Sequence, residues 1–326
     1  MTLSQFQGCL IGLAAGDALG APVEKQGQDE AREYLECLKS KDVGDRTTTF
    51  EDLPFGHITD DTQMTVALAE AMLMKSKGFF DGLCFRAKIL ELFEERIVGT
   101  GKGTKDAVKR LRETTEWQTT GGFSGGNGSA IRAAPAGLTA SYDVPAFQTA
   151  TLQSLPTHRD HTSIAGSVAV ALATHHLIDT KQLPLENIAG WVEHRDRGFA
   201  NDLRRLANWG DFPPEQVLGY IDDTQKATSW DIISPWARSC VLWAFYAYMT
   251  GDDYMDTIHR AIWCGGDVDS TAAIAGALYG TAHGLEAVPE WIQHRLIDVR
   301  GEGARGRLLD LGERLYEAVE SRKVKG

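Results

Sequence analysis

One stretch near the C-terminus constrains the fold more than any other, because it joins acidic residues to a run of very small side chains. Residues 265–271 read GGDVDST, and residues 272–278 read AAIAGAL. Side chains this small are typical of a helix that packs close against a neighbour, and we predict that this helix begins near Ser270. Asp267 and Asp269 would repel each other at its start unless a cation lay between them. A charged N-cap on a surface helix is the alternative interpretation.

A second acidic helix start lies earlier in the chain. Thr59, Asp60 and Asp61 come directly before a helical pattern of apolar residues that runs to Leu73. Carboxylate and hydroxyl oxygens bind hard divalent cations, and two adjacent ions can share bridging carboxylates. Without a cysteine cluster and with little histidine nearby, the pattern favours Mg²⁺ or Mn²⁺ over zinc. If the two helix starts do not meet in the fold, both are ordinary N-caps, and the sequence leaves this open.

The most glycine-dense stretch covers residues 121–128, which read GGFSGGNG, and it leads into a predicted helix start. Successive free backbone N–H groups at such a position form an anion site that suits phosphate. Asn127 would add a side-chain hydrogen bond. A flexible loop without a ligand explains the same composition, so glycine density alone does not decide between the two.

Three other motifs resemble known sites but lack required residues. Residues 99–104 (GTGKGT) do not have the spacing of a P-loop, and we predict a loop between two helices. His158, Arg159 and Asp160 lack the rest of a kinase catalytic loop, and we expect His158 to pack or to face a ligand. Residues 221–224 (IDDT) repeat the acidic pattern of the second helix start, but no small-residue helix follows, and we predict a surface turn.

The rest of the chain reads as helices joined by loops. No stretch shows sustained period-two alternation between turn signals, and no repeat or linker divides the chain. We therefore predict one compact all-α domain over residues 1–326. Thr2 and Gln5 fit a capping box at the start of the first helix, which should bring Asp17 and Glu24 to its C-terminal end.

Charge and cysteine content restrict the partners and the compartment. A formal net charge of −12 argues against stable, sequence-independent nucleic-acid binding. The five cysteines are scattered, contain no C-x-x-C pair, and suit a reducing compartment. The apolar stretch at residues 8–15 has no positive charge before it, and residues 240–249 are too few to span a bilayer. We predict a cytoplasmic protein with no membrane partner.

Five motifs, in order along the chain, resemble those of the ADP-ribosylglycohydrolase family. They are residues 12–24 (GLAAGDALGAPVE), 59–62 (TDDT), 126–128 (GNG) with Arg132 and Pro135, 157–158 (TH), and 265–270 (GGDVDS). Each motif alone is weak, but five in this order span most of the chain. The family commonly has Thr at the position of Ser270 and Thr-Asp at the position of Val268 and Asp269. Serine keeps a hydroxyl ligand, so metal binding should survive the change.

The resemblance implies an all-α fold, a single compact orthogonal helical bundle with a binuclear metal cleft. Two divalent cations, Mg²⁺ or Mn²⁺, would lie at the floor of the cleft. One ion would be held by Thr59, Asp60, Asp61 and Asp269, and the other by Asp267, Asp269 and Ser270. Glu24, Asp60 and Asp269 would be the catalytic residues, with Glu24 as ligand or as acid and base. The diphosphate and ribose would be bound by Gly122, Phe123, Ser124, Gly125, Gly126, Asn127, Gly128 and His158.

The activity implied by the resemblance is metal-dependent hydrolysis of the glycosidic bond between ADP-ribose and a modified acceptor. The acceptor would be protein arginine, as in the dinitrogenase reductase–activating branch, and free ADP-ribose would be the product. Serine-linked, small-molecule or nucleic-acid-linked ADP-ribose are alternatives. So are a non-catalytic ADP-ribose-binding protein and a metal-dependent phosphohydrolase. The concentrated motif carboxylates argue against a purely structural protein, which has no physical use for them.

Overall fold

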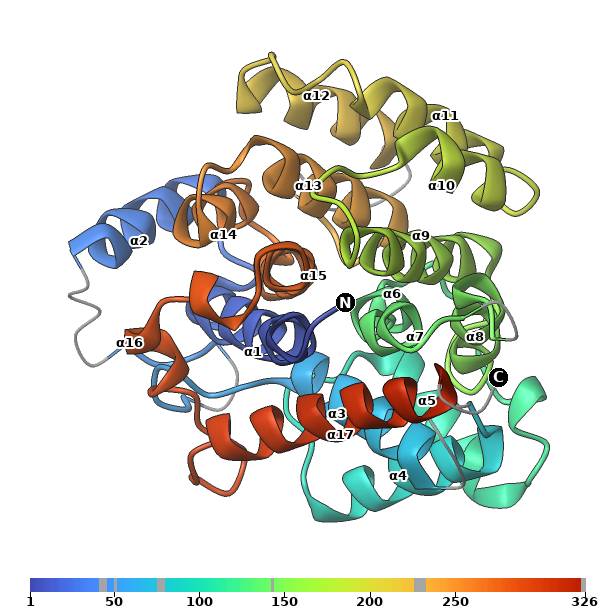
Figure 1. Cartoon of the computed structure of the whole chain (residues 1–326). Helices are drawn as coiled ribbons and strands as arrows, with labels where there is room; N and C mark the ends of the chain where they lie inside the picture. Colours follow the sequence, from blue (N-terminus) through green and yellow to red (C-terminus); the bar gives the residue numbers. More distant parts are fainter. Residues whose placement is uncertain (41–45, 50–51, 75–79, 142–143, 226–232, 324–326) are drawn as a thin grey trace.

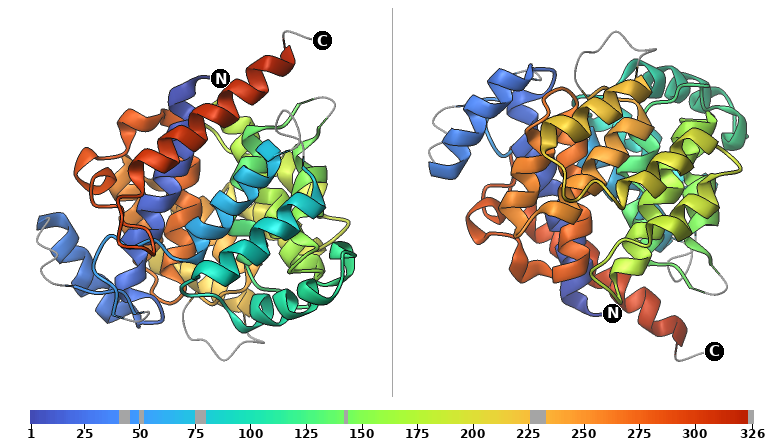
Figure 2. Two further views of the ribbon diagram at one scale, coloured as in Figure 1. Left: turned by 90° about the horizontal axis from the view of Figure 1, so that it is seen from below. Right: turned by 90° about the horizontal axis from the view of Figure 1, so that it is seen from above.

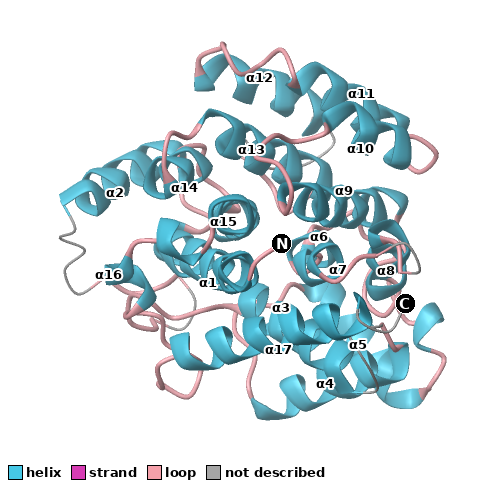
Figure 3. Cartoon of the chain, in the orientation of Figure 1, coloured by secondary structure: helices cyan, strands magenta, loops and turns pink. Residues whose placement is uncertain are grey.

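The computed structural model describes residues 1–40, 46–49, 52–74, 80–141, 144–225 and 233–323. Within these residues the chain forms helices and no strand, apart from isolated β-bridges such as that between Gly122 and His158 (Figure 3). The predicted all-α class is therefore confirmed. The assignment of residues 1–326 to a single domain stays a prediction.

The helices follow one another with short connections (Figure 1). In chain order the α-helices are α1 Leu3–Gly20, α2 Gln28–Ser40, α3 Asp60–Met74, α4 Gly82–Glu95, α5 Lys102–Glu113, α6 Gly128–Ile131, α7 Ala134–Leu138, α8 Ala146–Ser154, α9 His161–Leu177, α10 Leu185–Val192, α11 Arg197–Leu206, α12 Pro214–Gln225, α13 Ala237–Thr250, α14 Tyr254–Ile262, α15 Val268–His283, α16 Glu290–Gln293 and α17 Arg305–Lys323. Short 3-10 turns are η1 Ala21–Val23, η2 Trp117–Thr119 and η3 Leu285–Ala287.

Helices α1 and α15 lie side by side at the centre of the molecule (Figure 1). Their contact, which we call the α1–α15 seam, is formed by Gly8, Gly12 and Gly16 on α1 and by the small residues of α15 that face them. A Cβ on Gly16 would lie 2.0 Å from the carbonyl oxygen of Ala272, so the two backbones touch directly. The predicted close packing of the small-residue helix is confirmed. Its partner is the first helix of the chain.

Helix α1 begins at the predicted capping box, in which Thr2 and Gln5 satisfy each other's backbone N–H groups. Residues Leu3–Val23 are long and apolar enough to cross a membrane by length and composition. However, 89% of the 18-residue apolar window in this segment is buried inside the molecule. Because α15 and α17 cover it, α1 is a core helix. The cytoplasmic location stays a prediction.

The other helices surround this central pair (Figure 2). Helix α17 packs across α1 and α3, and α9 packs against α6, α7, α8 and α13. One large apolar cluster includes residues of most helices, among them α1, α9, α13, α15 and α17, and a smaller one lies among α3, α4 and α5. Three helix ends lie close together in this arrangement: the end of α1, the beginning of α3 and the beginning of α15.

Two local predictions were wrong. Residues 221–224 belong to α12 and do not form a surface turn. Val217 and Ile221 lie four residues apart and are both fully buried, so this segment buries a helical stripe. The predicted loop at residues 99–104 ends sooner, because Gly101 is the N-cap and α5 begins at Lys102.

Candidate metal centre and substrate cleft

Asp17 joins the end of α1 to the beginning of α3. Its Oδ2 accepts hydrogen bonds from the backbone N–H groups of Thr59 and Thr62, at 2.9 and 3.1 Å, and from the Thr62 hydroxyl. These N–H groups lie at a helix N-terminus, where intrahelical acceptors are lacking and negative charge is favoured. Asp17 therefore caps α3 from a different helix and fixes the position of the Asp60–Asp61 pair.

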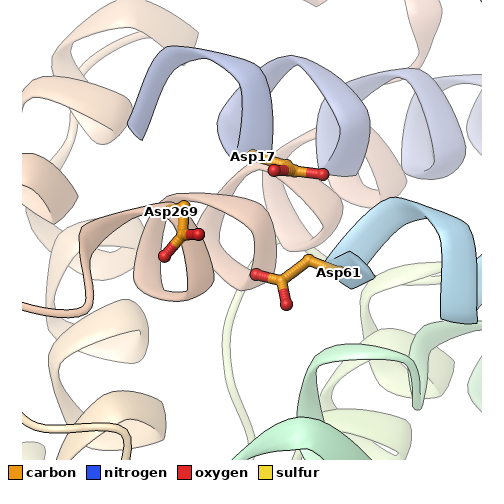
Figure 4. A group of neighbouring side chains, drawn as sticks. All are labelled: Asp17, Asp61 and Asp269. Atoms are coloured by element: carbon orange, nitrogen blue, oxygen red, sulfur yellow. The ribbon is translucent and has the colours of Figure 1, made fainter. Parts of the chain in front are cut away.

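The two acidic helix starts meet in the fold. Figure 4 shows Asp17, Asp61 and Asp269 on three neighbouring helices, and one carboxylate oxygen of each lies within 4.8 Å of the others. One carboxylate oxygen each of Glu24, Asp267 and Asp269 also lie within 4.8 Å of one another. Asp269 therefore belongs to both groups. This arrangement is the one that two adjacent ions with a shared carboxylate require. Asp17 was not among the predicted ligands.

The crowded carboxylates are strongly perturbed electrostatically. Burial raises the pKa of Asp17 to about 6, and burial together with nearby Asp17 raises the pKa of Asp60 to about 8. Burial, and then the charge of Asp267, raises the pKa of Glu24 to about 7. Buried like charges favour the protonated form, so at neutral pH this cluster requires protons or cations among its members.

The free ligand atoms fit a hard divalent cation. Asp17 Oδ1 and Asp61 Oδ2 are buried and have no hydrogen-bond partner within the described part of the chain. Burial also raises the pKa values of Asp61 and Asp269, with Asp60 and Glu24 respectively as the largest charged contributors. Buried carboxylate oxygens without a donor are costly unless a cation binds them. The donor set is oxygen only, which suits Mg²⁺ or Mn²⁺.

A cleft of about 260 Å³ opens onto this cluster. The sequence-predicted residues that line it are Glu24, Asp60, Asp61, Ser124, Gly126, Asn127, Gly128, His158, Asp267, Asp269 and Ser270. Four predicted residues do not line it: Thr59, Gly122, Phe123 and Gly125. Thr59 is buried beneath the cleft, where its hydroxyl accepts a hydrogen bond from the Asp61 N–H at 3.3 Å.

The three loop residues outside the cleft support the loop or lie on the surface. The Gly122 carbonyl accepts from the Arg159 N–H at 2.8 Å, and the Gly125 carbonyl accepts from the Ala237 N–H at 2.9 Å. The Phe123 side chain is 77% exposed, with the Arg159 guanidinium 4.9 Å from its ring centre. None of these three residues lines the cleft, so their predicted contact with substrate stays a prediction.

The glycine loop is held at Asn127 and open around it. The Asn127 N–H donates to the Pro235 carbonyl at 2.9 Å, and its side-chain amide donates to Asp267 Oδ2 at 2.5 Å. Within the described residues, the N–H groups of Gly126 and Gly128 on either side donate to no backbone carbonyl. Both line the cleft, so two backbone donors are available beside the carboxylate cluster for an anionic group.

His158 lines the same cleft as a neutral side chain. Its Nδ1 lies 2.8 Å from the Thr157 hydroxyl, which accepts a hydrogen bond from buried Arg132. Burial, and then the Arg132 charge, lowers the pKa of His158 to about 3. A neutral imidazole can hydrogen-bond or stack with a ligand, but it does not serve as an acid at neutral pH.

Sequence reasoning missed part of the cleft. Lys25 and the residues around Gly101 also line the cleft, including Gly99, Lys102, Gly103 and Thr104. The signal available for the second group was its glycine and lysine density, which by itself indicates only an incomplete P-loop. For Asp17, the signal was a charged residue inside an otherwise apolar, small-residue helix.

Comparisons with known proteins agree with this geometry. Residues 1–325 match the family model described as ADP-ribosylglycohydrolase. An uncharacterized protein of Archaeoglobus fulgidus is 31% identical over 96% of both chains. The ADP-ribosyl-[dinitrogen reductase] glycohydrolase of Rhodospirillum rubrum is 28% identical over 93% of both chains. The ADP-ribosylarginine hydrolase Tri1 of Pseudomonas putida is 27% identical over 89% of this chain and 74% of its own.

A solved structure shares the fold. It is described as an ADP-ribosylglycohydrolase-related protein complex, and it superposes with a TM-score of 0.72 over 97% of this chain and 98% of its own. At 24% sequence identity, this likeness concerns the arrangement of the helices alone.

Proposed function

Because this chain belongs to the ADP-ribosylglycohydrolase family, we propose that it hydrolyses the bond between ADP-ribose and a modified protein arginine, releasing free ADP-ribose. Hydrolysis of a glycosidic bond to ADP-ribose follows from family membership; the arginine acceptor is our inference. Two relatives support it by name, one acting on ADP-ribosyl-[dinitrogen reductase] and one on ADP-ribosylarginine. The acidic cleft adds a physical reason, because it attracts a cationic guanidinium.

One observation carries the proposal most directly: two groups of three carboxylates share Asp269 at the floor of a cleft with two open backbone donors. We infer that Asp17, Asp61 and Asp269 contribute to one cation site and that Glu24, Asp267 and Asp269 contribute to the other. Thr59, Asp60 and Ser270 lie close enough in sequence to add oxygens. When bound, two divalent cations supply Lewis-acid stabilisation and a more acidic water.

Other residues of the cleft would bind and orient ADP-ribose. The N–H groups of Gly126 and Gly128 suit the diphosphate, because backbone N–H groups can bind an anion without a positively charged side chain. Asn127 is held against Asp267, so the anion site and the carboxylate cluster keep a fixed separation. His158 lines the cleft beside these glycines. Because it is neutral, it would orient the nucleotide by packing or hydrogen bonding and not by charge.

Glu24 is the residue best suited to move the proton. Breaking the bond at the ribose C1″ leaves the bonding electron pair on the acceptor atom, which takes up a proton as it departs. In the metal-free protein burial and the charge of Asp267 raise the pKa of Glu24 to about 7, so this carboxylate can take up and release a proton near neutral pH when no cation holds it. It lines the cleft, with its carboxylate buried beside Asp267.

The products distinguish this function from the alternatives. ADP-ribosylarginine protein should give intact ADP-ribose and unmodified arginine by mass analysis, with activity lost on chelation. Phosphate or AMP would instead identify a phosphohydrolase. Tight ADP-ribose binding without release from any modified acceptor would identify a non-catalytic binding protein. Preferential release from serine-linked peptide would leave the hydrolase in place and overturn the arginine acceptor.

A further inference from the structure

Lys25 is a cation placed directly against the proposed acid. It follows Glu24 in the sequence and lines the same cleft. Its ammonium lies 3.1 Å from Glu24 Oε1 and 3.2 Å from Glu24 Oε2. The Glu24 side chain is 8% exposed and that of Lys25 54%, so a buried carboxylate is paired with a half-exposed lysine.

The backbone of Lys25 is fixed in an unusual conformation. Its φ of 64° is in the left-handed region, which only Asp52 shares among the described residues other than glycine. The Lys25 N–H donates to the Gly266 carbonyl at 2.7 Å, and the Gly266 N–H donates to the Gln26 carbonyl at 3.0 Å. These two hydrogen bonds tie Lys25 to the turn that comes directly before Asp267.

Stability does not account for this arrangement. A lysine in the left-handed region costs conformational free energy, and a half-exposed ion pair stabilises a fold little. Backbone strain that is held in place by surrounding hydrogen bonds is concentrated at functional sites. The consequence at this position is that one positive charge stands at the entrance to a group of carboxylates.

We propose that Lys25 discriminates between acceptors by their charge, because its ammonium occupies the place beside Glu24 that an arginine guanidinium would take. The inference rests on the proposed function, since it requires the acceptor to leave beside Glu24. A guanidinium must displace the ammonium or bind next to it, whereas a neutral serine oxygen meets no such repulsion. Lys25 thereby reduces the advantage that the acidic cleft gives to arginine. It is a specificity residue that acts on the acceptor and not on ADP-ribose.

The test compares matched peptides that carry ADP-ribose on arginine or on serine. For wild type, Lys25→Met, Lys25→Arg and Lys102→Met, the kcat/KM of ADP-ribose release would be measured on both peptides with Mg²⁺ present. Lys102 is the matched control, because it lines the same cleft but its ammonium is paired with Asp106 at 2.6 Å. ADP-ribose affinity would be measured for each variant by calorimetry.

Removing one charge a few ångströms from a cation in a solvent-connected cleft should change binding by about tenfold. We therefore expect Lys25→Met to raise the arginine-to-serine ratio of kcat/KM about tenfold, mainly through KM for the arginine peptide. Lys25→Arg and Lys102→Met should keep the wild-type ratio, and ADP-ribose affinity should stay constant in the two Lys25 variants.

An unchanged ratio in Lys25→Met, or an equal change for both peptides, would overturn the inference. So would a ratio that Lys102→Met raises as much as Lys25→Met does. If wild type releases ADP-ribose from neither peptide, the proposed function fails instead. The equilibrium affinities of the two peptides for wild type and Lys25→Met then decide the inference, with the same tenfold change in their ratio expected.

Discussion

Glycine serves two opposite purposes in two regions of this molecule. In the α1–α15 seam, glycine removes side chains so that two helix backbones touch, with no room for a Cβ on Gly16. In the loop at residues 121–128, glycine leaves N–H groups open to the cleft, and a Cβ on Gly126 would have no contact nearer than 3.4 Å. Both stretches stand out in the sequence by their glycines, but one is a packing surface and the other lines the cleft.

The difference explains how the site combines rigidity with access. Asp17 and Asp269 come from the two helices of the seam, so direct backbone contact sets the distance between them. The loop reaches the same cluster through Asn127, which contacts Asp267. Changes in the seam should therefore damage the fold and the metal centre together, whereas changes in the loop should weaken substrate binding alone.

The largest effect is expected in the seam. In Gly16→Val the new Cβ would lie 2.0 Å from the Ala272 carbonyl oxygen, a backbone atom that cannot move without separating the helices. Overpacking of a core commonly costs about 1–3 kcal/mol, and a backbone clash should cost at least the upper value. Because total stability is only about 5–15 kcal/mol, the variant should unfold at much lower denaturant concentration.

The matched control for the seam is Gly190→Val in α10. Gly190 is exposed, and a Cβ there meets nothing within 4 Å. Its denaturation midpoint should stay close to that of wild type. Equal midpoints for the two variants would show that the seam tolerates a side chain and that the close contact does not hold the fold.

The next effect concerns the residue shared by both carboxylate groups. Asp269→Asn keeps the shape of the side chain but removes the charge that balances a divalent cation. Loss of an outer partner of a metal ligand costs roughly 10- to 100-fold, so loss of a shared ligand should cost at least about 100-fold in activity and metal affinity. Circular dichroism should show a folded protein. Hydrolysis rate and bound Mn²⁺ are the measurements.

Asp310→Asn provides the control, because Asp310 is exposed on α17 and pairs only with Arg314, at 3.4 Å, among the described residues. It should keep full activity and metal content. Asp269→Asn with wild-type metal content would mean that the two carboxylate groups do not hold ions through a shared ligand.

A smaller effect is expected in the loop. In Gly126→Val the new Cβ would lie 3.4 Å from His158 Nε2, so the added methyl groups would crowd the imidazole and block close approach to the N–H. ADP-ribose affinity should fall about tenfold, the order of one lost hydrogen bond to a charged group. Calorimetry measures the affinity, and metal content should stay unchanged. Undiminished affinity in the folded variant would remove this loop from the site.

The parts of the site that could be predicted from the sequence are those with a local signal. The acidic residues at 59–61 and 267–270 stand out because each precedes a helical pattern, and the glycine loop stands out by composition. Helix periodicity likewise predicts the all-α class. A local pattern does not show which residues far apart in the chain become neighbours, so only the structure establishes that the two acidic starts converge.

The residues that were missed owe their roles to tertiary contacts. Asp17 caps α3 across the fold, and Lys25 is positioned by hydrogen bonds to a turn near the other end of the chain. Residues 99 and 101–104 line the cleft because the start of α5 lies beside the glycine loop. Conversely, Phe123 belongs to the glycine loop, part of which lines the cleft, but Phe123 itself is exposed to solvent. Loop membership alone does not give side-chain direction.

The smallest expected effect is on the pH dependence of stability in metal-free protein, which should change with the carboxylate cluster but not with the glycine loop. The folded-state pKa values of about 6 for Asp17 and about 8 for Asp60 lie above the value of about 4 in an unfolded chain. At pH values between the unfolded and the folded pKa, the folded state binds more protons than the unfolded state. The stability that these two groups contribute is therefore complete below about pH 4 and is lost as pH rises to 8. With chelator present, wild type and Gly126→Val should lose stability in parallel between pH 7 and 8, whereas Asp60→Asn should lose about 1 kcal/mol less. Mn²⁺ should cancel the loss in wild type, because the cation replaces the protons. A chelated Asp60→Asn variant that declines as steeply as wild type would show that the buried Asp60 carboxylate does not set this pH dependence.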